Sequence, residues 1–222
     1  MNRPQTDKIL LSVGFCYLPL KEVPVKKMFL LSLGLVAALA TSSLTGSVSA
    51  EETATHDEVK SGPKGGDYLG PFTVTKIAGA EEDGVAEGKK LCYRCKNGSR
   101  PQVVIFTRST GPEVAALVSK IDSALVEHQS EKLTCFVNVM AENAEEAAES
   151  AKKFAMTSKV KNIPFVVPNE FENGPDDYGI NPKAEVTVTF ATDGKVVASH
   201  GFASAKDVCL DTCMADLASL VK

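Results

Sequence analysis

The chain has 222 residues, with 24 Lys and Arg against 28 Asp and Glu, a formal net charge of −4, and six cysteines. Without the first 50 residues the balance is 19 basic against 26 acidic residues, a net charge of −7. Such an acidic chain lacks the clustered cations that bind phosphate backbones, so no nucleic acid is expected as a partner. The 172 residues after position 50 suit one domain with a single core.

The first 50 residues have the composition of an export signal. Residues 28–40 are mostly Leu, Val, Ala and Phe, they follow two lysines, and small residues occupy positions 48–50. This order predicts a signal peptide region over residues 1–50 with its apolar segment at 28–40. That segment is shorter than the roughly 20 apolar residues that span a bilayer, and no cysteine directly follows it to carry a lipid. We expect an exported protein, periplasmic or secreted, with no stable membrane anchor; translation can start at Met1 or Met28.

The residues after the export signal are polar and rich in glycine. From residue 51 to 70 no apolar period occurs. This composition predicts a flexible leader, which we place at 51–61, before a domain at 62–222. Apolar and polar side chains alternate over residues 72–77, which predicts a half-buried strand, and an acidic loop at 79–88 follows.

A cysteine pair, Cys92-Tyr93-Arg94-Cys95, precedes the most apolar strand candidate of the chain. The β-branched and aromatic run 103–106 is short enough for a buried strand, and Asn97-Gly98 before it predicts a turn. A helix over residues 112–128 should follow, with Thr110 as its N-cap and Glu113 as the capping-box partner.

The second half repeats this plan and predicts an α/β domain in which helices flank a mixed sheet. The glutamates on the outer face of its first helix are expected to form a solvated surface. The predicted elements are a strand at 133–140, a helix at 143–156, a strand at 163–167, a hairpin of 186–190 with 195–199 around Asp193-Gly194, and a terminal helix from a Ser204 cap, with Asp207 at its third position, to residue 221.

The order of these elements resembles the thioredoxin fold, specifically its peroxiredoxin and alkyl-hydroperoxide-reductase-like branch. The resemblance implies an exported bacterial thioredoxin-like protein whose domain covers residues 62–222. The segment 91–101 also resembles one in exported bacterial thioredoxin-like proteins, from which no activity follows. Besides the central strand and helix, the matching segments are Gly70-Pro71-Phe72-Thr73-Val74, Ile163-Pro164-Phe165-Val166-Val167, Tyr178-Gly179-Ile180 and residues 187–197.

The chain departs from this family at the usual active site. In redox-active thioredoxins a Cys-x-x-Cys pair follows the central strand, at the N-terminus of a helix whose N–H groups stabilise the thiolate. This chain has Arg108-Ser109-Thr110-Gly111-Pro112 there. Peroxiredoxins place their reactive cysteine in the same region, so a peroxidase is disfavoured. The cis-proline of thioredoxins would fall at 184–186, and Pro182 is too early to match it.

The displaced cysteine pair has three explanations. Redox exchange by Cys92 and Cys95 is favoured by Arg94 and Lys96, because cations stabilise a thiolate and no acidic residue occurs from 88 to 110. A structural disulfide is the second, although closing so small a loop contributes only about 2 kcal/mol. The third is a zinc knuckle, which would need the four thiolates Cys92, Cys95, Cys209 and Cys213 around one ion.

The cysteines on the terminal helix argue against zinc. We expect Cys213 to face the sheet, too far from Cys92 to share a ligand, and Cys135 to be a buried strand residue. No motif for a cofactor occurs. The predicted function is therefore thiol–disulfide exchange with an exported redox partner protein, and the alternative is a non-catalytic thioredoxin-fold binding or scaffold domain.

Overall fold

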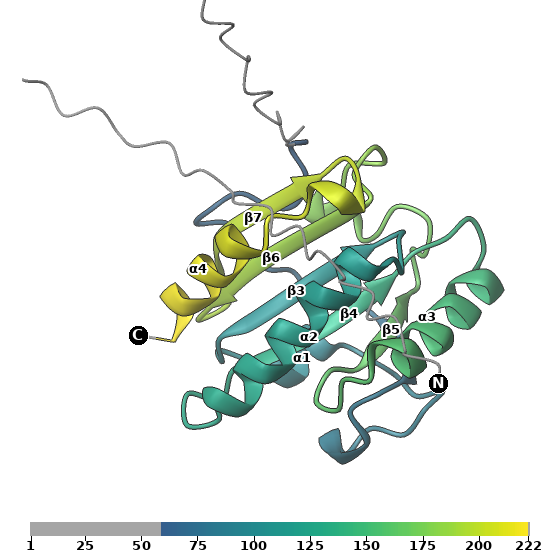
Figure 1. Cartoon of the computed structure of the whole chain (residues 1–222), viewed down its shortest axis with the longest axis horizontal. Coiled ribbons are helices and arrows are strands. Elements are labelled where there is room, and N and C mark those ends of the chain that lie inside the picture. Colours follow the sequence, from purple (N-terminus) through teal and green to yellow (C-terminus); the bar gives the residue numbers. More distant parts are fainter. Residues whose placement is uncertain (1–58, 222) are drawn as a thin grey trace, which may run out of the picture. The chain divides into compact units, whose positions relative to one another are not determined.

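A seven-stranded mixed sheet with the order β2-β1-β5-β4-β3-β6-β7 organises residues 59–221, the part of the chain that this computed structural model describes (Figure 1). The predicted signal peptide region and residues 51–58 lie outside the described residues. The strands are β1 (Val74–Ala78), β2 (Lys90–Leu91), β3 (Gln102–Thr107), β4 (Thr134–Val139), β5 (Phe165–Pro168), β6 (Val186–Thr192) and β7 (Lys195–Phe202). The helices are α1 (Tyr93–Asn97), α2 (Pro112–Glu127), α3 (Ala144–Ser158) and α4 (Leu210–Leu220), with short 3-10 turns η1 (Glu81–Asp83), η2 (Asp176–Tyr178) and η3 (Ala205–Asp207).

Strand β3 lies near the middle of the sheet, as its apolar sequence predicts. It pairs in parallel with β4 and antiparallel with β6, and all six of its residues are buried. Strands β6 and β7 form the predicted hairpin around Asp193-Gly194, with Thr192 paired to Lys195. The predicted α/β class, with helices flanking a mixed sheet, is confirmed.

The two faces of the sheet are covered differently. Helices α2, α3 and α4 lie together over one face, in front of the strands in Figure 1, because the crossovers β3-α2-β4 and β4-α3-β5 run on the same side. The other face is covered by α1 and by loops, through an aromatic cluster that includes Phe72, Tyr93 and Tyr178. Alternation along β3 assigns Val104 and Phe106 to this second face.

Two predicted helix caps are wrong, although the predicted start of α2 at Pro112 is right. Helix α2 has Gly111 as its N-cap, not Thr110, because Pro112 occupies the first helical position and holds the residue before it extended. Ser204 does form a capping box with Asp207, but it caps the single turn η3. The chain is extended again at Val208, and α4 begins only after Cys209.

The predicted flexible leader at 51–61 is wrong for residues 59–61, because these residues and the polar residues 62–70 after them are bound to the domain. The Val59 N–H donates to the Gly201 carbonyl of β7 (3.1 Å), and the Gly66 N–H donates to that of Val196 (2.8 Å). Gly201 allows this approach, since a Cβ there would lie 2.1 Å from the Val59 carbonyl oxygen. The segment therefore runs along the outer edge of β7, where Ser61 and Leu69 become buried.

Among residues 59–221, no helix combines the length and the apolar character needed to cross a membrane.

Candidate functional site

The two predicted redox residues form a disulfide on the short helix α1. Cys92 is the N-cap of this helix, and its Cα lies 5.2 Å from that of Cys95. The Cys95 N–H donates to the Cys92 sulfur at 3.0 Å. Cys95 is exposed and Cys92 is half-buried, so a reactant in solution can reach the pair.

The end of α1 is closed by its own residues. Gly98 follows the helix with φ +64°, and its N–H donates to the Arg94 carbonyl. The Arg100 guanidinium donates to the carbonyls of Lys96 (2.8 Å) and Asn97 (2.9 Å), so it satisfies acceptors that a helix end leaves open. The predicted turn at Asn97-Gly98 is confirmed, whereas the helical turn before it was not predicted.

Tyr93, between the two cysteines, anchors α1 to the domain. Its ring is buried and stacks on Phe136 of β4, with 5.7 Å between ring centroids. Its hydroxyl donates to the Asp83 carboxylate at the end of η1. Burial and the acceptor Asp83 raise the pKa of Tyr93 far above its ordinary value, so the phenol keeps its proton.

A buried lysine completes this anchor. Lys76, on β1, is 1% exposed, and its ammonium donates to Asp83 (2.8 Å) and to the carbonyls of Ala80 (2.9 Å) and Val85 (2.8 Å). Sequence reasoning missed this residue, although alternation with Val74 assigns position 76 to the inward face of the strand. Lys76, Asp83 and Tyr93 thus form one connected network beneath the disulfide.

The two predicted thiolate-favouring charges point to different neighbours. The Arg94 guanidinium lies over the β6–β7 turn, since a Cβ on Gly194 would come within 2.5 Å of its Nη2. Its Nε is buried with no hydrogen-bond partner in the described part of the chain. Lys96 is exposed and lines a hollow on the other side of α1.

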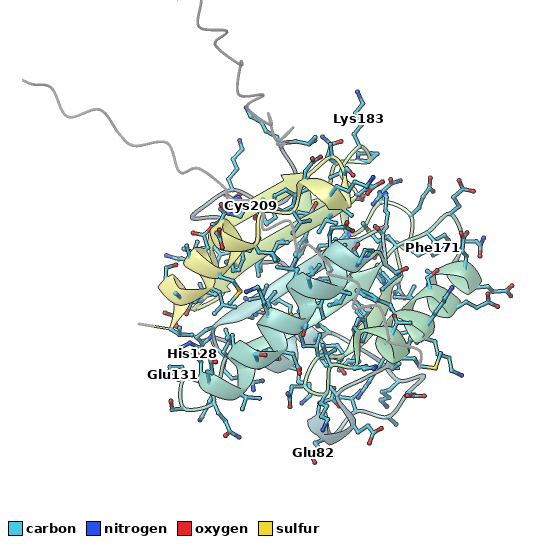
Figure 2. The ribbon with its side chains drawn as sticks, viewed as in Figure 1. Glu82, His128, Glu131, Phe171, Lys183 and Cys209 are labelled. Carbon is cyan, nitrogen blue, oxygen red and sulfur yellow. A yellow bond between two sulfur atoms is a disulfide. The ribbon has the colours of Figure 1, made fainter. Side chains whose placement is uncertain are left out.

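This hollow has a volume of about 430 Å³ and lies between α1, the C-terminal end of α2, η1 and the start of β4. Lys96 and Arg100 line it from the α1 side, and Glu82 lines it from η1. Figure 2 labels Glu82 on the turn that projects from the domain. A partly apolar space therefore opens directly beside the helix that carries the disulfide.

The usual thioredoxin active-site position is at the other end of β3. Helix α1 precedes this strand and residues 108–111 follow it, so the two places lie at opposite ends of a strand of six residues, which is about 15 to 20 Å long at 3.3 Å per residue. Arg108 there donates to the Glu172 carbonyl (2.8 Å), and burial lowers the pKa of its guanidinium. No peptide bond within residues 59–221 is cis, and Ala184 and Glu185 directly precede β6.

The structure does not bring the four cysteines of the zinc alternative together. Cys209 caps α4, and Cys213 lies one turn further on, buried on the side of α4 that also buries Leu217. Within residues 59–221 no group of three or more His, Cys, Asp or Glu side chains could hold a metal ion. Cys135 is buried in β4 as predicted.

Comparison with solved structures agrees with this fold. Neither a protein-family model nor a curated protein matches the sequence. A candidate protein disulfide isomerase from Bacteroides thetaiotaomicron matches with a TM-score of 0.52 and 14% identity, over 72% of this chain and 92% of the other. A conserved uncharacterized protein from Geobacillus kaustophilus matches with a TM-score of 0.51 and 14% identity, over 73% and 85%. Peroxidoxin BcpB from Mycobacterium tuberculosis has a TM-score of 0.49 and 16% identity, over 70% and 97%.

Similarity at this level of identity shows the fold alone. What the matches and the sheet topology together show is that the described residues form a thioredoxin-like domain, whose Cys-x-x-Cys disulfide is carried on a helix before the central strand.

Proposed function

We propose that Cys92 and Cys95 carry out thiol–disulfide exchange with an exported partner protein. The observation that carries this proposal is the geometry of α1, in which an accessible disulfide has one sulfur within reach of a backbone N–H. A donor at this position stabilises negative charge on Cys92 when the disulfide opens. Tyr93 and Arg100 hold the turn in place while the bond changes.

The exchange proceeds in two substitutions at sulfur. A partner thiolate attacks one sulfur of the pair, the Cys92–Cys95 bond breaks, and the other cysteine leaves as a thiolate. The partner's second thiolate then attacks the mixed disulfide, so the partner becomes a disulfide and the pair a dithiol. Two electrons pass from partner to pair, and the reverse sequence reduces a partner disulfide.

A purely structural role explains this disulfide less well. Closing a loop of four residues stabilises a fold by about 2 kcal/mol in the chain-entropy model. The same turn is already held by the Tyr93 hydroxyl and by the Arg100 guanidinium. The Cys92–Cys95 disulfide therefore adds little to the stability of a turn that these contacts already hold.

A reduction potential tests the proposal. Structural disulfides have potentials below about −300 mV, whereas exchange-active ones lie higher. We expect a value above that limit from equilibration with glutathione, and insulin reduction by the parent chain that the Cys92→Ser variant loses. A potential below the limit, with no difference between parent and variant, would refute the exchange function.

A second candidate function is a non-catalytic binding or scaffold domain. The observation that favours it is the loop 108–111, which has no cysteine at the position where related folds carry their reactive one. In that case the parent and the Cys92→Ser variant bind the same partner with equal affinity. Pull-downs with both proteins separate the two functions.

Export is part of the proposal because disulfides persist in oxidising compartments. The predicted signal peptide supports it, and fractionation of cells that express the full chain tests it. We expect the protein outside the cytoplasm and shortened to begin near Glu51. Full-length protein in the cytoplasm would contradict this part of the proposal.

A further inference from the structure

We propose that the hollow beside α1 binds an acidic segment of the partner chain, next to the partner's reacting cysteine. This inference rests on the proposed exchange function and names the class of protein on which it acts. Three features support it: the charge around the cysteine pair, the shape of the hollow and the nature of its lining.

The charge around the pair is positive in an otherwise acidic domain. Between residues 88 and 110 the sequence has basic side chains and no acidic one. Lys89, Lys90 and Lys96 are exposed, and within the described residues none of them makes an ion pair. Basic side chains that make no ion pair therefore stand both before and after the two cysteines in the sequence, where a partner would approach the disulfide.

The two acidic residues that line the hollow offset little of this charge. Asp83 lines the hollow, but its carboxylate already accepts from Lys76 and Tyr93. Glu82 is exposed and lines the hollow from η1. Among the described residues the lining thus has two cations, Lys96 and Arg100, against one carboxylate, Glu82, that makes no ion pair.

The lining suits an extended peptide. Leu125, Leu133 and Pro164 form the apolar part of the lining, and the exposed side-chain amide of Gln129 can bond a peptide backbone. Val126, which also lines the hollow, is 62% exposed and offers apolar surface to a bound peptide. A segment lying here places its neighbouring cysteine against α1.

Exchange rates with charged peptides test this inference. Two peptides of equal length each carry one reduced cysteine pair, which glutamates flank in the first peptide and lysines in the second. The rate at which each peptide reduces the oxidised protein is measured at low and at high salt. We expect the acidic peptide to react about tenfold faster at low salt, and the ratio to approach one at about 1 M salt, where the Debye length is about 3 Å.

Matched charge reversals locate the effect. Lys96→Glu should abolish the preference for the acidic peptide, whereas Lys183→Glu should leave it unchanged. Both lysines are exposed, and Figure 2 shows Lys183 at the end of the domain opposite Glu82. The two variants have equal net charge, so a loss of preference in both would mean that the whole domain's field, not the hollow, selects the partner.

A small neutral thiol distinguishes a failure of the docking inference from a failure of the proposed exchange function. Dithiothreitol needs no docking surface, so its rate with Lys96→Glu reports only the loss of a charge that favours the thiolate, whereas the ratio of the two peptide rates reports docking. Normal reaction with dithiothreitol but equal rates for the two peptides would overturn the docking inference alone. No reaction with dithiothreitol or with either peptide would overturn the exchange function, and the inference with it.

Discussion

The Tyr93 hydroxyl donates its hydrogen bond to the Asp83 carboxylate, which ties the residue between the two cysteines to the turn η1 ten positions earlier. Asp83 in turn accepts from the buried Lys76 ammonium. The position of the disulfide therefore depends on a charged network inside the domain as well as on helix α1 itself.

Removing one hydroxyl should loosen this anchor. We expect Tyr93→Phe to lower the free energy of unfolding by about 1.5–3 kcal/mol, because hydrogen bonds to charged groups contribute that much. Denaturant unfolding of both proteins measures the difference. Tyr68→Phe is the matched control, since Tyr68 is 71% exposed and should change stability little. Equal losses in both variants would show that the Asp83 contact contributes nothing.

Acid should weaken the same network. Burial alone would raise the pKa of Asp83, but the hydrogen bonds from Lys76, Tyr93 and the Val85 N–H outweigh it and lower the pKa below its ordinary value. The carboxylate therefore stabilises the fold above its ordinary pKa of about 4, and this contribution disappears as pH falls through the lowered value. Asp83→Asn should be less stable than the parent at pH 7, and the gap should close toward pH 2. A gap that stays constant with pH would contradict this assignment.

The buried amide of Gln102 predicts a stabilising substitution. Gln102 is fully buried at the start of β3, and neither of its side-chain polar atoms has a hydrogen-bond partner within the described residues. An unsatisfied buried polar group costs about 1–3 kcal/mol, so Gln102→Met, of similar shape, should raise the free energy of unfolding. Asn138→Leu is the contrasting variant and should lower the free energy of unfolding. The Asn138 amide donates to the Ile105 carbonyl at 3.0 Å, and the substitution removes this hydrogen bond. A destabilised Gln102→Met variant would show that the amide is satisfied in solution.

Cysteine labelling should separate the exchange pair from the core thiols. Burial raises the pKa of the Cys135 thiol well above its ordinary range and that of Cys213 to about 12, so neither is a thiolate at pH 8. After mild reduction of the native protein, iodoacetamide should modify Cys92 and Cys95 and leave Cys135 and Cys213 unmodified. Peptide mapping by mass spectrometry reads this out, and the unfolded protein is the positive control. Rapid labelling of Cys135 would mean that β4 opens readily.

The central parts of the fold could be predicted because their signals are local. The run 103–106 is apolar enough to be a buried strand, and Asp193-Gly194 indicates a hairpin turn without reference to the rest of the chain. Helix α1 has no such signal. Five residues cannot hold a helix alone, and this one depends on the contact of Tyr93 with Asp83, ten residues away.

The sequence selects the residues of the candidate site, but not the surroundings in which the fold places them. Cys92 and Cys95 follow from their spacing, and Arg94 and Lys96 from the charge around them. The directions in which these side chains point do not follow from the sequence, because the fold of the sheet brings the β6–β7 turn next to Arg94. The same reasoning applies to residues 59–70, whose polar sequence resembles a linker and whose backbone nevertheless pairs with β7.

Residues 59–68, which lie along the edge of β7, limit the ways in which this domain can bind another protein. Open strand edges invite a second chain to add a strand, and proteins restrict this by covering an edge or keeping it short. Residues 59–68 occupy the backbone of β7 at several points, while β2 at the opposite edge has only two residues, next to Lys89. A partner seeking main-chain hydrogen bonds finds little at either edge of the sheet, so recognition is left to side chains.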